Sequence, residues 1–153
     1  MDKRIAELEW RPFGGWNYSY PEEWMRNTSW SIWASVTLGS LQVDWREAAI
    51  ILGSAFYCQE NGIFLTMDPS SVGDGASWVH NVQAGYLWYH YFVKRNRKTL
   101  VAIGTWMEIA GDVGSVSQIF GKYHDHAHLD GATTGFLAAF LLDKLFRKKK
   151  PLL

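Results

Sequence analysis

Long stretches of mostly uncharged, largely apolar residues alternate with short polar segments along this chain. The polar segments are the loop Met67–Ala76, which has turn-forming Pro, Gly and Asp, the basic turn Lys94–Lys98 and the polar turn Gly121–Asp125. The stretches between these breaks are predicted to be helices, so the sequence indicates an all-α chain. The expected helices are Thr28–Val43, Trp45–Thr66, Ser77–Val93, Thr99–Phe120 and His126–Phe146.

A chain of 153 residues has room for one domain with one sizeable core. Residues 1–27 combine Trp, Pro, Gly and charge, which predicts an irregular N-terminal segment at an interface. Residues 28–146 are expected to form a helical membrane domain, and residues 147–153 a basic C-terminal tail.

Three features favour a membrane. Helices of about 17–22 residues are about 25–33 Å long, close to the apolar thickness of a bilayer. Nine Trp and seven Tyr are residues that favour a membrane–water boundary. If the last three helices are antiparallel, the Lys94–Lys98 turn and Arg147–Lys150 lie on one side, as the positive-inside rule requires. We therefore expect a bundle of four to five membrane-spanning helices.

Charge narrows the choice of partners and places a condition on this bundle. Acidic and basic residues are equal in number, so no overall positive field would attract nucleic acid. Acidic residues inside the predicted helices must face the bundle interior, a water-filled cavity or a protein partner. They are Glu108, Asp112, Asp130 and Asp143.

Two short motifs carry candidate chemistry. Gly75-Ala76-Ser77-Trp78 places a serine where a loop becomes a helix, and Ala127-His128-Leu129-Asp130-Gly131 places a histidine in a small-residue helix. Both resemble motifs of the rhomboid intramembrane serine proteases. Residues 112–132 are most similar to the mitochondrial presenilin-associated type. The resemblance implies a serine endopeptidase with Ser77 as nucleophile and His128 as base, in the mitochondrial inner membrane.

The sequence departs from the family in ways that weaken the catalytic interpretation. Trp78 replaces a glycine after the serine, and no His-x-x-x-Asn pattern precedes Ser77 to stabilise an oxyanion. We therefore expect a non-catalytic pseudoprotease, an accessory or structural subunit whose partners are lipid and other membrane-protein subunits, without a cofactor. An active intramembrane protease and a soluble helical binding module are the alternatives.

Small residues predict where two helices touch. Gly131 and Gly135 stand four apart in the last helix, and Ala84 and Gly85 offer a matching face on the serine helix.

The segment from His124 to Asp130 holds three histidines and two carboxylates, a composition compatible with zinc. It is also similar to a strand motif of TatD-type metal-dependent hydrolases, but those need a barrel of about 250 residues. A polar turn with one helix-entry histidine is the preferred interpretation, with no metal site assigned. His80 and His90 are expected to be hydrogen-bonded residues and not ligands.

Overall fold

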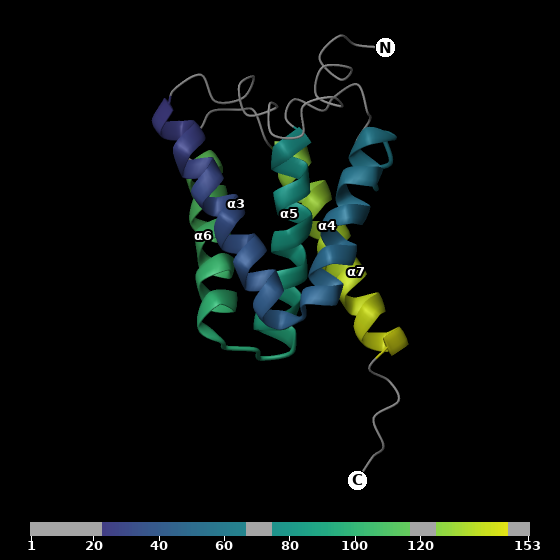
Figure 1. Ribbon diagram of the computed structural model, residues 1–153. Helices are drawn as coiled ribbons and strands as arrows, with labels where there is room; N and C mark the ends of the chain where they lie inside the picture. Colours follow the sequence, from purple (N-terminus) through teal and green to yellow (C-terminus); the bar gives the residue numbers. More distant parts are fainter. Residues whose placement is uncertain (1–22, 67–74, 117–124, 147–153) are drawn as a thin grey trace.

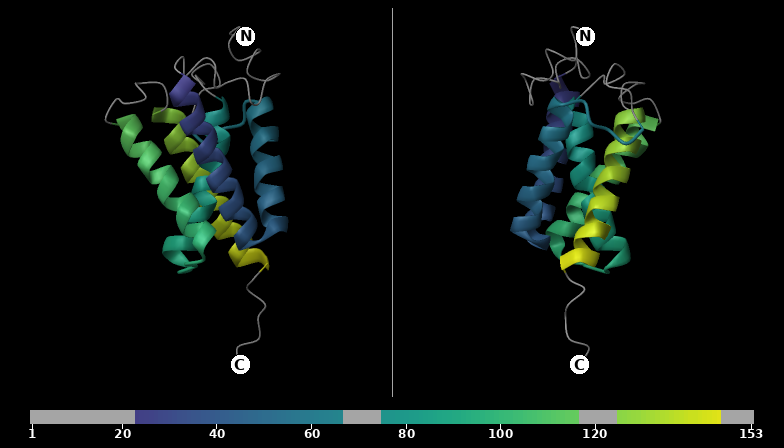
Figure 2. Two further views of the ribbon diagram at one scale, coloured as in Figure 1. Left: turned by 60° about the vertical axis from the view of Figure 1, so that its left-hand side comes forward. Right: turned by 90° about the vertical axis from the view of Figure 1, so that its right-hand side faces the viewer.

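The computed structural model describes residues 23–66, 75–116 and 125–146, which form five α-helices with a π-helical extension to one of them. The helices run up and down alongside one another (Figures 1 and 2). Their bounds are α3 Glu23–Val43, α4 Trp45–Glu60, α5 Gly75–Trp88, the π-helix η2 Tyr89–Val93, α6 Thr99–Val116 and α7 Asp125–Phe146. Five helices were predicted at these places, although α3 begins at Glu23, within the segment expected to be irregular, and α4 ends six residues before the expected Thr66.

Polar side chains explain two of the helix boundaries. Asp44 is extended between α3 and α4, and its carboxylate accepts hydrogen bonds from the backbone N–H groups of Arg46 and Glu47 at 2.9 and 3.1 Å. The Gln42 side-chain oxygen on α3 accepts the N–H of Leu100 at 2.7 Å, which satisfies one free donor at the start of α6. These contacts fix where α4 and α6 begin.

Helix α5 lies at the centre of the bundle (Figure 1), where it packs most extensively against α7. Every residue from Trp78 to Leu87 is buried, including the polar His80, Asn81 and Gln83. Helix α3 packs mainly against α6. The core cluster therefore centres on α5, with apolar residues such as Trp33, Val36 and Ile51 contributed by α3 and α4.

The expectation of a membrane-spanning rhomboid-like bundle is wrong for the helices that the structure describes. None of them combines the length and the apolar character needed to cross a bilayer. The physical reason is the carboxylates within them, two in α6 and two in the interior of α7, which offset the apolar residues. This finding also overturns the expected integral membrane location, the mitochondrial inner membrane assignment and the role as a membrane pseudoprotease subunit.

Three of the four acidic residues within the predicted helices face the bundle interior, one of the environments expected for them. Glu108, Asp130 and Asp143 are buried inside the bundle. The Lys94–Lys98 turn lies at the same end of the bundle as the end of α7 (Figure 1). The basic tail and most of the irregular N-terminal segment fall outside the described residues.

Candidate metal centre

Helix α6 presents two carboxylates on one face. Glu108 and Asp112 are four residues apart, so they lie one above the other on the same face of the helix. Glu108 is 1% exposed, whereas the side chain of Asp112 is 24% exposed. One carboxylate therefore lies in the bundle interior and the other at its edge.

Two histidines from the neighbouring helices meet these carboxylates. His128, in the first turns of α7, places its Nδ1 2.5 Å from Oδ1 of Asp112. His80 of α5 places its Nδ1 3.0 Å from Oε2 of Glu108. The two imidazole rings lie edge to face with their centroids 6.0 Å apart. Three helices thus bring two imidazoles and two carboxylates together where α5 and α7 begin and α6 ends.

Three of these residues converge closely enough to share one ion. Ligand atoms of Glu108, Asp112 and His128 all lie within 4.8 Å of one another. In a tetrahedral zinc site with ligands at about 2.1 Å, neighbouring ligand atoms stand about 3.4 Å apart. Side-chain movements that shorten the largest separation by up to about 1.4 Å would therefore let the three atoms contact one ion. His80 does not belong to this group, but its contact with Oε2 of Glu108 can orient that carboxylate toward an ion.

The electrostatics of the cluster favour a bound cation. Burial raises the pKa of Glu108 well above its usual value, and the nearby charge of Asp112 raises it further, while His128 acts in the opposite direction. Two adjacent carboxylates with one deeply buried are costly to ionise together. A divalent ion would remove this cost because it neutralises both.

The structure describes the side chain of only one member of the predicted Ser77–His128 pair. His128 lies against Asp112, as described above. Ser77 falls in the first turn of α5, but its side chain lies outside the described residues, so the catalytic pairing stays a prediction.

Trp78 has a structural use. Its fully buried indole donates Nε1–H to Oδ1 of Asp130 on α7 at 2.8 Å and packs edge to face on Phe64. Trp78 therefore joins α5 to α7 and to the segment that follows α4.

The glycines predicted for helix packing lie where α5 and α7 come closest. A Cβ atom placed on Gly85 would lie 2.1 Å from the carbonyl oxygen of Ala132, and one on Gly135 would lie 1.8 Å from that of Val82. For Gly131 the nearest atom is the carbonyl oxygen of Trp78 at 2.6 Å. Ala84 is fully buried in the core cluster.

Sequence reasoning missed the convergence of Glu108, Asp112 and His80. It considered metal only for the segment from His124 to Asp130, of which His124 and the side chain of His126 lie outside the described residues. The available signal was two carboxylates four apart in an otherwise uncharged helix. Which histidines they meet depends on helix packing that no single segment reveals.

No family model, curated protein or solved structure matches the chain. The rhomboid resemblance therefore stays a prediction, and the function is argued from the residues themselves.

Proposed function

We propose that this protein is a helical metal-binding module that holds one divalent transition-metal ion between α6 and α7. Glu108, Asp112 and His128 are the ligands. The observation that supports this proposal is the convergence of their ligand atoms within 4.8 Å across two helices.

The ligand set indicates which ions are suitable. Imidazole suits zinc and iron, and carboxylate oxygens suit manganese, so one imidazole with two carboxylates fits Zn²⁺, Fe²⁺ or Mn²⁺. The partial exposure of the Asp112 and His128 side chains, 24% and 15%, gives an ion a path into the site. Three protein ligands also leave coordination positions open for water or a small ligand, as in catalytic sites rather than closed structural ones.

His80 supports the proposal from outside the ligand set. A carboxylate that binds a metal is usually oriented by a hydrogen bond from a neighbouring side chain. The 3.0 Å contact from His80 Nδ1 supplies this for Glu108 in a buried environment, where both side chains are at most 4% exposed. His80 is a positioning residue because it acts on the ion through Glu108.

Calorimetric titration of the full-length, EDTA-treated protein with Zn²⁺ and separately with Mn²⁺ tests the proposal. We expect one ion per chain for at least one metal. Asp112→Asn, His128→Gln and Glu108→Gln should each weaken binding at least tenfold. Glu60→Gln, on an exposed residue of α4, is the matched control and should bind like the native protein.

Circular dichroism should show that Glu108→Gln keeps its helices, because the amide has nearly the size of the carboxyl group and its oxygen can still accept a hydrogen bond from His80 Nδ1. The double variant His124→Gln/His126→Gln should bind the metal as the native protein does. Loss of binding in this variant would show that His124 or His126 is a ligand and would contradict the proposed ligand set. No saturable binding of either metal, or unchanged affinity in the three ligand variants, would contradict the proposal.

A further inference from the structure

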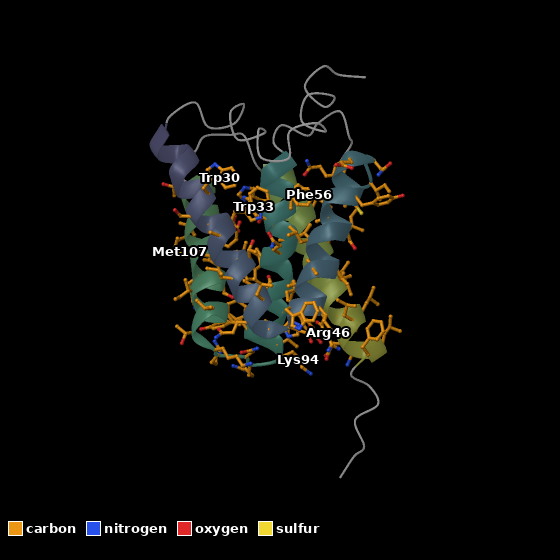
Figure 3. The ribbon with its side chains drawn as sticks, in the orientation of Figure 1. Trp30, Trp33, Arg46, Phe56, Lys94 and Met107 are labelled. Carbon is orange, nitrogen blue, oxygen red and sulfur yellow. The ribbon has the colours of Figure 1, made fainter. Side chains whose placement is uncertain are left out.

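A second site lies beside the candidate metal centre, between α3 and α4. The two helices separate from their junction at Asp44 (Figure 1), and a hollow of about 430 Å³ opens between them. Trp30, Trp33 and Ala34 of α3 form one side, and Leu52 and Phe56 of α4 form the other. Figure 3 shows Trp30, Trp33 and Phe56 near the end of the bundle opposite Lys94.

We propose that this hollow binds a neutral, planar aromatic small molecule. Its volume is within the range of about 300–1,000 Å³ that small-molecule pockets occupy. This inference does not depend on the metal proposal.

The aromatic walls suit a flat ligand. Trp30 and Trp33 are stacked with ring centroids 5.5 Å apart and only 11° between their planes. Phe56 faces Trp33 at 6.1 Å with a tilt of 42°. Trp33 is 5% exposed and Trp30 is 40% exposed, so one ring is held in the core while the other remains accessible at the opening. A planar ring would gain offset-stacked or edge contacts with these side chains.

The charge of the lining excludes an ionic ligand. None of the residues around the hollow is charged, and the polar member, Thr37, has its hydroxyl oxygen accepting a hydrogen bond from Nε2 of Gln83 at 3.0 Å. An ionised ligand would lose hydration without gaining a partner.

The two sites are separated by one ring. The centroid of Trp33 lies 6.5 Å from that of His80, which in turn contacts Glu108. Trp33 therefore belongs both to the lining of the hollow and to the surroundings of His80.

Fluorescence titration with the neutral dye 6-propionyl-2-dimethylaminonaphthalene, in buffer with EDTA, tests the inference. We expect saturable binding by the native protein. Ala34→Trp should weaken it at least tenfold, because Ala34 is exposed to the hollow and a large ring there would fill it. Ala110→Trp, on an exposed alanine of α6 outside the hollow, is the matched control and should bind like the native protein.

Competition identifies the ligand chemistry. Neutral 2-acetylnaphthalene should displace the dye, whereas anionic 2-naphthoate and the non-aromatic decanol should be at least tenfold weaker. Equal binding by Ala34→Trp and the native protein would place the dye on the outer surface and overturn the proposal. Equal competition by 2-naphthoate or by decanol would overturn the assignment to a neutral aromatic ligand. Because EDTA is present throughout, failure of the metal proposal would leave these outcomes unchanged.

Discussion

A single carboxylate, Asp130, joins three parts of the chain. Its Oδ1 accepts the indole N–H of Trp78 on α5, and its Oδ2 accepts the backbone N–H and the hydroxyl of Thr66 at 2.6 and 2.9 Å. Burial alone would raise the pKa of Asp130, but these hydrogen bonds favour the ionised form and lower it overall. Asp130 is therefore an acceptor that the fold uses fully, distinct from the pair of carboxylates on α6.

Asp130→Asn should destabilise the protein by about 1–3 kcal/mol, because the amide replaces one acceptor oxygen with a donor that faces other donors. Urea unfolding measures the change. Combining it with Trp78→Phe, which removes the indole N–H together with part of the ring, gives a double-mutant cycle in which the loss of ring packing cancels. We expect a coupling of about 1 kcal/mol, and a coupling near zero would show that the indole contact does not stabilise the fold.

Ser77 should not behave as an activated nucleophile. The sequence lacks an upstream His-x-x-x-Asn pattern that could supply a donor for an oxyanion, and loss of one such donor typically slows acyl transfer about 10²–10³-fold. A fluorophosphonate probe should therefore leave the native protein unlabelled, and Ser77→Ala should preserve metal affinity. Labelling at Ser77 that is lost in His128→Ala would show that the serine and histidine form a catalytic pair.

At the scale of elements, the contact between α5 and α7 decides how the bundle is assembled. The nearest atoms to Gly85, Gly131 and Gly135 are backbone carbonyl oxygens of the facing helix, which cannot rotate away as a side chain could. The two helices therefore touch backbone to backbone, so there is no room for even a methyl group.

Gly135→Ala should destabilise the protein by about 1–3 kcal/mol or more through overpacking. Gly53→Ala is the matched control, since a Cβ atom at Gly53 on α4 meets nothing within 4 Å. That change should stabilise the protein by up to about 1 kcal/mol, the difference in helix propensity. Thermal unfolding of both variants measures the effects. Equal stability of Gly135→Ala and the native protein would contradict the close contact.

The positions of the helices could be predicted from sequence, whereas their environment could not. Asp44 and the Lys94–Lys98 turn interrupt the apolar stretches, and local turn and capping chemistry acts at those positions. The membrane prediction rested on helix length, aromatic content and the placement of basic residues at one end of the bundle. Helix α6 has 18 residues, but its Glu108 and Asp112 contact histidines of α5 and α7 and would be unfavourable against lipid. Contacts between residues of different helices depend on how the helices pack, so the candidate site could be recognised only in the folded structure.

On the scale of the whole molecule, the candidate metal centre connects distant parts of the chain. Its ligands come from α6 and α7, and His80 extends the contacts to the central helix α5. A bound ion would therefore oppose global unfolding instead of one local opening.

Metal should raise the unfolding midpoint of the whole bundle. An ion at one hundred times its dissociation constant adds about 2.7 kcal/mol when it binds only the folded chain. For a protein of this size that corresponds to about 5–10 °C. Differential scanning calorimetry with Zn²⁺, before and after EDTA, measures the shift. Asp112→Asn is the control and should show a smaller shift, because affinity that is tenfold weaker reduces the added stability to about 1.4 kcal/mol or less at the same Zn²⁺ concentration. A native protein whose midpoint neither Zn²⁺ nor Mn²⁺ shifts would argue against the centre.

The burial of α5 has a consequence for how its amide hydrogens exchange with solvent. Because Trp78–Leu87 is enclosed on all sides, these backbone N–H groups should reach water only when neighbouring helices separate. Helix α4 exposes Ala49, Ile50, Gly53 and Ser54 and can open locally. In deuterium exchange followed by mass spectrometry, peptides from α5 should therefore exchange last, at a rate set by the free energy of unfolding the whole bundle.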